Sequence, residues 1–466
     1  MTVVQPKQKH FDRSLVEGPI GPAVWKLAWP TMLQNVIAGL QGVIDHTMVG
    51  HFVGYVGNAA VGVSWQIIIV VIVFATSVFS GMGVLVARFA GANQPDKVNR
   101  VVYQAFLTAA GLSVVLGAAG WLAAPSLLDL VNAAPEVRAE ALPFLRAMLV
   151  GILGMMLFFM LSGAFRAAGD ARTPLRLGVL MTALTIVLNV ILIPMFGTIG
   201  AAYGTIGSST AVAMFGVWQM SRPSSVIHFG YGMSRKPDWV IIRSLFRFGL
   251  PTGVQGIAMN IAGVLLLRYI GSLEFSAAAQ AAYAVGYTEL FSFITWTSVG
   301  LMSAAATVAG QNLGAGRPDR VMEGVAVASR IGIGVAALVG GLFILVPKYL
   351  LAAFGMTDPE VLSIGGQLLR YLSVSGFFIA VALCYTGGLQ GTGDTRSPLY
   401  ISIVSQIVVP LGICATLQSF GALSAAGIWT AILIGHVTRC ALSVLRFRQQ
   451  KWRNIRVEIE PAATGT

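Results

Sequence analysis

The segment AFRAAGDARTPL, residues 164–175, returns as GLQGTGDTRSPL at residues 388–399, which lies 224 positions further along the chain. A second pair, GANQPDKV at 91–98 and GAGRPDRV at 314–321, has nearly the same spacing. Two different motifs that repeat in the same order at one offset indicate duplication of a whole half-chain. Any account of function therefore has to use two similar halves.

The composition places both halves in a lipid bilayer. Apolar residues make up 56% of the chain and charged residues only 10%, and the mean hydropathy is +0.78. Soluble domains carry about 25% charged residues. The 54 glycines fit a membrane protein, because small residues let membrane helices approach one another closely.

Apolar segments of about 20 residues, the length that crosses about 30 Å of hydrocarbon, predict the fold class. We expect an all-α integral membrane protein with twelve transmembrane helices, arranged as two pseudosymmetric six-helix lobes. Six spans separate the copies of each motif, so both copies lie on one side of the membrane and the lobes are parallel repeats. The predicted spans are 24–46, 58–86, 101–124, 140–164, 174–195, 198–219, 245–269, 277–309, 321–346, 364–388, 397–418 and 423–446.

Loop charge predicts the orientation of these spans. Lys and Arg gather in every second loop, among them 88–100, 166–176 and 222–247, while the intervening loops hold few. The positive-inside rule then places both termini in the cytoplasm of a bacterial-type inner membrane. This pattern also explains the formal charge of +12, so inner-leaflet lipid is the expected partner of the basic side chains and nucleic acid is not.

The chain divides into five predicted segments. They are a cytoplasmic tail (1–23), a first lobe (24–219), a cytoplasmic linker (220–244), a second lobe (245–446) and a basic cytoplasmic tail (447–466). No cleavable signal peptide is expected, because the first apolar run is too long and lacks a clear cleavage site. Three cysteines, Cys384, Cys414 and Cys440, have the spacing of neither a metal site nor a disulfide framework, and we assign them to packing.

The repeated motifs carry a family resemblance. The paired Gly-Asp-x-Arg-[Thr/Ser]-Pro and Gly-Ala-x-x-Pro-Asp loops, together with VIDHTMVG (43–50) and GTIGAAYGT (197–205), resemble the multidrug and toxic compound extrusion (MATE) family over about residues 20–446. The resemblance implies a V-shaped protein of two six-helix lobes. It also implies export of organic cations or other toxic compounds against proton or sodium entry.

Acidic side chains inside the spans are the candidates for ion coupling. Of 18 acidic residues, only Asp45 and Glu289 lie well inside the predicted spans. A carboxylate at the bilayer centre costs about 2.5–3.5 kcal/mol on insertion scales, so such a residue usually faces a cavity and has a function. Both are therefore candidates for binding a proton or a sodium ion.

Asp45 belongs to a polar stripe. Gln34, Ala38, Gln41 and Asp45 recur at helical spacing, which places two amides and a carboxylate on one face. We expect this face to point into the first lobe. The competing interpretation places Asp45 beyond the helix end, in interfacial water beside His46. The resemblance implies that Asp45 is the coupling carboxylate, because the family has a span-one aspartate in this Val-x-Asp pattern.

Span five offers a second polar stripe in the first lobe. Thr182, Thr185 and Asn189 follow at i, i+3 and i+7, and they are candidate cavity residues. The family often has Asn-x-x-x-Asp-Pro here, whereas this chain has Ile193 in place of the acid. That difference argues against a relay of two carboxylates. Two roles stay open for Asn189: it is a hydrogen-bond partner of Asp45 or of the substrate, or it only joins neighbouring helices.

The second lobe holds a different set of polar residues. One branch of the family carries a carboxylate in span seven where this chain has Asn260, so the resemblance favours the DinF-like branch and leaves Asn260 as a cavity candidate. Glu289 has Ser292 and Trp296 on its face at i+3 and i+7. Three roles stay open for Glu289: a second titrating site, a group that attracts cations, or a structural acid paired with a neighbouring hydroxyl.

Aromatic residues follow the same span at i, i+4 and i+8, as Tyr283, Tyr287 and Phe291. Rings in this arrangement could bind a flat lipophilic cation through cation–π contacts. An ordinary packed aromatic face explains the same spacing more simply.

The repeated loops have a structural interpretation. Asp170 and Asp394 can cap the helices that follow them, and Arg172 and Arg396 fit the positive-inside pattern. We assign these four residues to structure and to gating on the cytoplasmic side.

The predicted function is secondary transport. The sequence has no Gly-x-x-x-x-Gly-Lys-[Ser/Thr] loop and no His-Glu-x-x-His motif, so neither direct ATP use nor zinc hydrolysis is expected, and the protein is not an enzyme. We expect an antiporter of organic cations, monomeric, with no cofactor beyond the coupling proton or sodium. The alternative is a flippase for lipid-linked oligosaccharides or lipids; such proteins often have extra spans or several basic residues in the cavity, and we expect neither here. A channel fits less well, because a buried acid in paired lobes suits alternating access.

Overall fold

A computed structural model describes residues 11–222, 225–228, 236–457 and 459. All regular elements within these ranges are helical. Parts of the predicted terminal tails and of the 220–244 linker lie outside the described residues. Each of the twelve predicted spans coincides with helical structure, so the all-α membrane fold expected from the repeats is confirmed.

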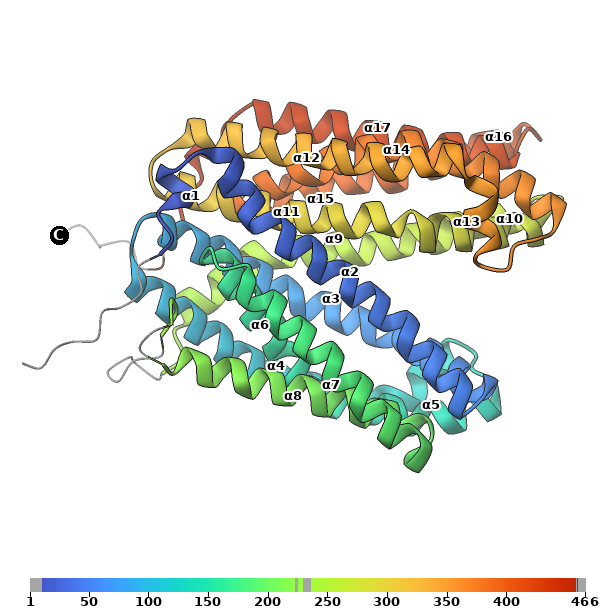
Figure 1. The fold of residues 1–466 in the computed structure, drawn as a ribbon, viewed down its shortest axis with the longest axis horizontal. Coiled ribbons are helices and arrows are strands. Elements are labelled where there is room, and N and C mark those ends of the chain that lie inside the picture. Colours follow the sequence, from blue (N-terminus) through green and yellow to red (C-terminus); the bar gives the residue numbers. More distant parts are fainter. Residues whose placement is uncertain (1–10, 223–224, 229–235, 458, 460–466) are drawn as a thin grey trace, which may run out of the picture. The chain divides into compact units, whose positions relative to one another are not determined.

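The first half of the chain forms long helices joined by short turns (Figure 1). Their bounds are α2 Ile20–Phe52, α3 Tyr55–Gly91, α4 Pro95–Leu130, α5 Pro135–Val150, α6 Ile152–Ala167, α7 Arg172–Phe196 and α8 Thr198–Met220, preceded by the one-turn helix α1 Ser14–Glu17. The predicted fourth span is a pair, α5 and α6, bent by 50° around Gly151.

The second half repeats this order with more interruptions. The helices are α9 Trp239–Gly271, α10 Ser276–Tyr283, α11 Ser292–Gly314, α12 Pro318–Leu345, α13 Pro347–Ala352, α14 Pro359–Thr392, α15 Arg396–Ile403, α16 Val409–Ser419 and α17 Ala425–Arg448. Two π-helical segments, η1 Ala284–Leu290 and η2 Val404–Val408, interrupt the predicted eighth and eleventh spans, and a short 3₁₀ turn, η3 Lys451–Asn454, follows α17.

Within the part of the chain that is described, nine continuous helical segments are long and apolar enough to cross a bilayer, and the bent α5–α6 pair makes a tenth. Two of the nine, Ser276–Gly314 and Arg396–Ser419, run through the π-helical segments η1 and η2. The remaining two predicted spans correspond to α2 and α8. Both are more polar: α2 carries Gln34, Gln41 and Asp45, and α8 carries several serines and threonines.

Contacts divide the chain into two compact units. Among the described residues, the first unit contains most of 36–253 and the second contains 14–35 and 254–456. Two long helices therefore change unit along their length, α2 after Asn35 and α9 after Gly253. The lobe boundaries predicted from the sequence, 24–219 and 245–446, stay a prediction.

Glycines explain how closely the helices pack within each unit. In the first unit, a Cβ on Gly81 would lie 2.1 Å from the carbonyl oxygen of Leu245, so α3 and the first part of α9 touch backbone to backbone. In the second unit, a Cβ on Gly391 would lie 2.0 Å from the carbonyl oxygen of Ala306, which joins α14 to α11 in the same way. Small residues at such crossings are what membrane helices use in place of a hydrophobic driving force.

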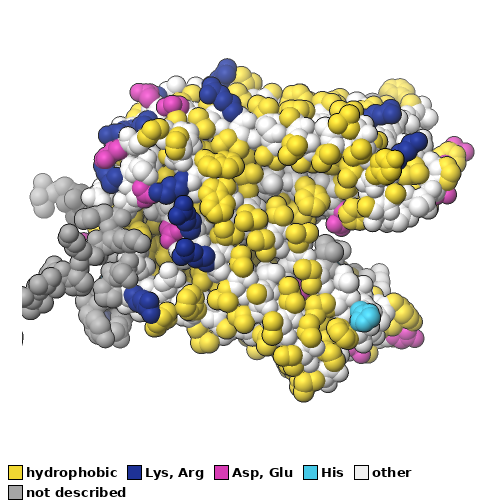
Figure 2. Space-filling model, in the orientation of Figure 1, with side chains coloured by type: hydrophobic (Ala, Val, Ile, Leu, Met, Phe, Trp, Pro, Cys, Tyr) yellow, Lys and Arg dark blue, Asp and Glu magenta, His cyan; other side chains and the backbone are white. Residues whose placement is uncertain are grey.

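The outer surface matches a lipid environment. In the second unit, α12, α14 and α17 run side by side (Figure 1), and hydrophobic side chains cover the face drawn over them in Figure 2. Lys and Arg are few along this face. Large apolar residues such as Leu338 and Leu345 are more than two-thirds exposed, as expected where lipid replaces water.

Candidate functional site

Asp45 lies inside a helix. α2 continues to Phe52, two turns beyond Asp45, so the interpretation that placed this residue past the helix end is wrong. The side chain is half-buried in the first unit. The carboxylate is therefore only partly enclosed by protein.

Two amides hold the Asp45 carboxylate. Asn189 on α7 donates from Nδ2 to Asp45 Oδ1 at 3.0 Å, and the Gln41 side chain, one turn earlier on α2, also hydrogen-bonds to the carboxylate. Asn189 is fully buried. The predicted partnership of the two polar stripes is therefore formed at Asp45 and Asn189.

Thr182 belongs to the same network. Its hydroxyl donates to Gln41 Oε1 at 2.8 Å, which fixes the orientation of the Gln41 amide and directs its NH₂ group toward Asp45. Four residues, Gln41, Asp45, Thr182 and Asn189, thus form one polar site between α2 and α7.

Other predicted members of this site lie elsewhere. Thr185 is fully buried, and its hydroxyl bonds to the Met181 carbonyl at 2.8 Å and to Ser208 on α8 at 2.7 Å. It joins α7 to α8 and does not contact Asp45. Gln34 is buried eleven residues before Asp45, about 16 Å along the helix at 1.5 Å per residue, and belongs to the second unit.

Gly204 on α8 packs against the Asn189 amide, and it was not predicted as a site residue. A Cβ on Gly204 would lie 2.0 Å from Asn189 Oδ1, so only glycine lets α8 approach the amide this closely. Within the described part of the chain, Asn189 Oδ1 has no hydrogen-bond partner, although the NH₂ group of the same amide donates to Asp45. The GTIGAAYGT motif contained this glycine, but nothing in the motif indicated that it faces an asparagine.

The second acid of the family motif is replaced by a hydrophobic contact. Ile193 is 1% exposed and packs in the core of the first unit with Val49 and Ala201.

His46, the residue after Asp45, forms a hydrogen bond with α3. Its Nδ1 lies 2.7 Å from Asn58 Oδ1. Asn58 was missed because it lies at the start of a predicted span with no periodic polar partner.

Glu289 has no partner in the described part of the second unit. It lies half-buried in η1, and the hydroxyl of Ser292 donates to the Thr288 carbonyl, so Ser292 does not pair with the acid, as the third of the open roles would require. A π-helical segment turns more slowly than an α-helix, which removes the i+3 relation that the prediction assumed. Asn260 is exposed, and its amide donates to the Gly256 carbonyl of its own helix at 2.9 Å.

The predicted aromatic stripe is a continuous stack. The rings of Tyr283 and Tyr287 lie parallel with centroids 5.0 Å apart, and Tyr287 and Phe291 are 5.4 Å apart. Tyr283 also stacks on Trp429 and Tyr287 on His436, both from α17. These rings contact one another, which agrees with a packed aromatic face.

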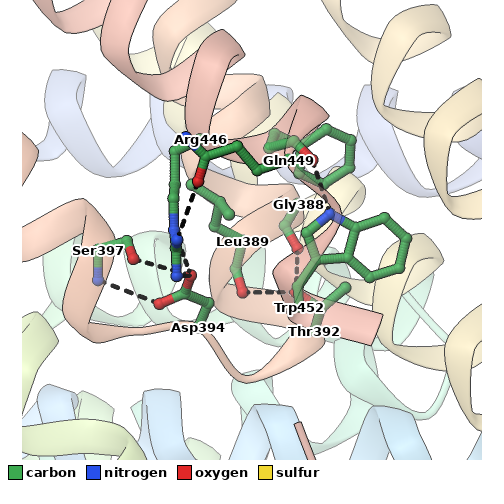
Figure 3. A network of polar contacts seen from close by, with 9 residues as sticks. Gly388, Leu389, Thr392, Asp394, Ser397, Arg446, Gln449 and Trp452 are labelled. Atoms are coloured by element: carbon green, nitrogen blue, oxygen red, sulfur yellow. Dashed lines mark hydrogen bonds and ion pairs between the residues drawn. The ribbon is translucent and has the colours of Figure 1, made fainter. Parts of the chain in front are cut away.

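The two Gly-Asp-x-Arg loops cap helices. Asp170 Oδ1 accepts from the backbone N–H groups of Arg172 and Thr173, at 3.1 and 3.0 Å. Asp394 accepts from the Ser397 N–H at 3.1 Å and, unlike Asp170, also forms an ion pair of 2.9 Å with Arg446 on α17 (Figure 3). Arg172 and Arg396 are exposed at the starts of α7 and α15.

A second amide contact lies at the corresponding crossing of the other unit. Gln255 on α9 donates to Ser402 Oγ at 2.7 Å, and Gln390 donates to Gln255 Oε1 at 3.3 Å. This helix pair corresponds to α2 and α7 in the repeat. Neither glutamine was predicted, because a single amide in an apolar span gives no periodic signal.

Arg439 is the main residue that sequence reasoning missed. It lies in α17, inside the predicted span 423–446, and is only 6% exposed. No role was predicted for this arginine from the sequence. The available signal was an arginine three residues after His436 in an otherwise apolar segment.

Comparison with known proteins agrees with the duplication. A family model described as MatE matches residues 30–191 and again 251–416. The chain is 27% identical over 438 residues to a probable multidrug resistance protein, NorM, of Thermotoga maritima, covering 92% of each chain. It is 26% identical over 459 residues to the probable multidrug resistance protein YpnP of Bacillus subtilis, covering 97% of this chain and 100% of that protein.

The fold is shared with solved structures. A transporter of the MOP superfamily from Pyrococcus furiosus superposes with a TM-score of 0.88 at 22% identity, covering 96% of this chain and 98% of the other. At this identity the similarity establishes the helical architecture.

Proposed function

The chain belongs to the multidrug and toxic compound extrusion (MATE) family, and from this premise we propose that it is a secondary antiporter that exports organic cations in exchange for protons or sodium ions. Asp45 is the proposed coupling site. The relatives named as multidrug resistance proteins support small molecules as substrates. Assignment to the DinF-like branch stays a prediction.

The observation that carries this proposal is the chemistry around Asp45. Two amides orient the carboxylate, yet no Lys or Arg forms an ion pair with it among the described residues. A half-buried carboxylate without a fixed counter-charge is stabilised by whichever cation reaches it. A proton, a sodium ion and a cationic substrate therefore exclude one another at this group, and such exclusion is what an exchanger requires.

The amides suit either coupling ion. Asn189 and Gln41 donate to the ionised carboxylate, and a proton on Asp45 would remove the need for one of these bonds. For sodium, the carboxylate oxygens supply the hard ligands that such cations prefer. Single-carboxylate exchange is favoured because Ile193 occupies the place of a second acid.

A pH titration of substrate binding tests the proposal. Binding of ethidium to the purified protein should weaken as the pH falls, because a protonated Asp45 no longer attracts the cation. The two ligands are linked, so the change should be about 5- to 150-fold in affinity. Asp45→Asn should bind ethidium weakly at every pH and should not support ethidium export driven by a pH or sodium gradient in proteoliposomes.

Asp129→Asn is the matched control. Asp129 is an exposed acid in the same unit, paired with Arg138 at 3.0 Å, and its replacement should leave both binding and export unchanged. If Asp45→Asn keeps the wild-type pH dependence, another group carries the exchange and the proposal fails. Glu289→Gln would then be the next variant to examine, because Glu289 is the other acid inside a span.

Lipid flipping is the alternative function, and the same proteoliposomes can be used to measure the movement of lipid between the two leaflets. The buried Arg439 is one basic group of the kind that flippases use for lipid phosphates. The described interior of the second unit does not show the several basic residues expected of a flippase.

We also propose that the protein is a monomer of the bacterial inner membrane, with cytoplasmic termini and without catalytic activity.

A further inference from the structure

A row of polar side chains lies buried on one face of α17. His436, Arg439 and Ser443 follow at i, i+3 and i+7 and are 2%, 6% and 0% exposed. Arg439 is nine residues from the end of the helix at Arg448, about 14 Å at 1.5 Å per residue, so it lies well inside the span. None of these residues belongs to the Asp45 site, which is in the first unit.

The row is unsatisfied. His436 Nδ1, Arg439 Nε and Ser443 Oγ are buried and have no hydrogen-bond partner among the residues that the structure describes. Ser405 Oγ is also unpartnered; it lies on η2, which packs against α17 where a Cβ on Gly435 would be 2.7 Å from the Ser405 carbonyl. Buried polar atoms are almost always hydrogen-bonded, so a concentration of exceptions calls for a partner that the chain does not supply.

The missing partner has to carry negative charge. A guanidinium keeps its proton in proteins, and a buried charge without a counter-charge is strongly destabilising. Arg439 makes no ion pair within the described residues. It interacts electrostatically with Tyr287 and His436, neither of which is anionic at neutral pH. Glu289, two residues from Tyr287, is not bonded to it. Water could satisfy the N–H and O–H groups but could not balance the charge.

The chemistry of the row also selects an anion. Arg439, Ser443 and Ser405 offer unpartnered N–H or O–H donors, and His436 offers a donor at Nδ1 in one tautomer. Tyr287, which interacts electrostatically with Arg439, adds a phenol O–H. One guanidinium supplies one positive charge, which suits a monovalent anion. The stacked rings of Tyr287, Phe291 and His436 leave an apolar wall that would disfavour a strongly hydrated polyanion.

Both π-helical segments of the second unit border this row. η1 carries Tyr287, whose ring stacks on His436 at 6.4 Å, and η2 carries Ser405. π-helical segments are rare and occur frequently at functional sites. Their position supports a site here over an accidental defect in packing.

We propose that the second unit contains a binding site for a small monovalent anion, formed by Arg439, His436, Ser443 and Tyr287. The occupant is a free halide or the carboxylate of a transported molecule, and both present the same chemistry to the guanidinium. The site is separate from the coupling carboxylate, so it stands or falls independently of the proposed exchange at Asp45.

Direct binding can be measured on the purified protein in detergent. The ³⁵Cl resonance should broaden in the presence of wild-type protein, and bromide should reverse the broadening in a saturable manner. The melting temperature should rise with chloride when isethionate, which is neither a halide nor a carboxylate, is replaced at constant ionic strength, because a ligand that binds only the folded state stabilises it. Acetate and benzoate form the second arm: competition by them, but not by bromide, would identify the carboxylate as the occupant.

Arg439 variants locate the site. Arg439→Gln should abolish both effects, while Arg439→Lys, which keeps the charge but loses the planar fork, should weaken binding by about 10-fold. Arg370→Gln is the matched control, since Arg370 is exposed in the same unit and its replacement removes the same charge. Arg370→Gln should bind chloride as the wild type does.

Each result decides the proposal. Wild-type protein that shows no saturable effect of halide or carboxylate overturns it, whether or not any variant folds. Equal binding by Arg439→Gln and wild type also overturns it, because the anion would then bind elsewhere. If Arg439→Gln fails to fold, Ser443→Ala and Tyr287→Phe, which each remove one donor, should still weaken the wild-type effect, and unchanged binding in both would count against the site.

Discussion

At the scale of single residues, the coupling site depends on contacts that a sequence only partly reveals. The stripe on α2 and the stripe on α7 were both visible as periodic polar residues, and their meeting at Asp45 and Asn189 follows from the need to bury polar groups together. The distinction between Thr182, which joins the site, and Thr185, which faces α8, was not visible. Both threonines lie on a similar face, and only the position of Ser208 separates them.

Gly204→Ala tests the support behind Asn189. The added methyl would lie 2.0 Å from Asn189 Oδ1, so the amide has to move and its bond to Asp45 is lost or lengthened. Overpacking of this kind costs about 1–3 kcal/mol, so the melting temperature should fall. The pH dependence of ethidium binding should also weaken, because Asp45 loses its fixed orientation.

Gly207→Ala is the control on the same helix. Its Cβ would meet only the flexible end of Leu188, at 3.2 Å, and should change neither property by much. If Gly204→Ala changes neither the melting temperature nor the pH dependence of ethidium binding, the close packing of α8 against Asn189 has no part in the site.

At the scale of helices, the two halves differ where the sequence repeats. The loops at Asp170 and Asp394 both cap a helix, but only Asp394 is joined to the last helix of its half, through Arg446 (Figure 3). Arg222 is the equivalent of Arg446 at the same offset. It lies beyond the end of α8 at Met220 and rests on the Trp218 ring at 3.6 Å instead. Because α17 continues to Arg448, Arg446 lies inside the helix and connects α17 to the loop at Asp394.

Arg446→Met should destabilise the protein more than Arg222→Met. Asp394 is buried and would be left without its cation, which costs about 2 kcal/mol, between the values for exposed and buried pairs. Arg222 is exposed, and losing its contact with Trp218 should cost about 0.5–1 kcal/mol. Thermal unfolding of both variants measures the difference.

A double variant isolates the ion pair. In an Asp394→Asn background, Arg446→Met should have little further effect, because the charge that needed compensation is already gone. Equal losses in the two backgrounds would mean that Arg446 acts through packing of its aliphatic stem and not through Asp394.

At the scale of the whole molecule, the apolar segments and the repeat predicted the order of the helical spans, several of which the structure divides into more than one helix. An apolar segment long enough to cross the bilayer has to be a helix, because its backbone hydrogen bonds must be satisfied within the segment. Spans can therefore be recognised from the hydropathy of the sequence alone. Three features could not be predicted. The π-helical segments η1 and η2 depend on neighbouring helices, the burial of Arg439 depends on what faces α17, and the change of unit within α2 and α9 depends on tertiary contacts.

Orientation in the membrane is the remaining prediction at this scale, and it follows from charge alone. Gln94 lies in an exposed turn between α3 and α4, flanked by Arg88, Lys97 and Arg100, so the positive-inside rule places it in the cytoplasm. Tyr55 and Phe420, 83% and 81% exposed, lie at helix ends whose loops carry few basic residues, and they should face outward.

Cysteine labelling tests this orientation in intact cells. Cys384 and Cys414 are buried, so Cys440→Ala gives a background with little native reactivity. In that background, Tyr55→Cys and Phe420→Cys should react with a membrane-impermeant maleimide, whereas Gln94→Cys should react only after the cells are permeabilised. All three positions are exposed, so a failure to react reflects the membrane and not burial. Labelling of Gln94→Cys alone in intact cells would invert the topology, and because six spans separate the repeats it would invert both halves together.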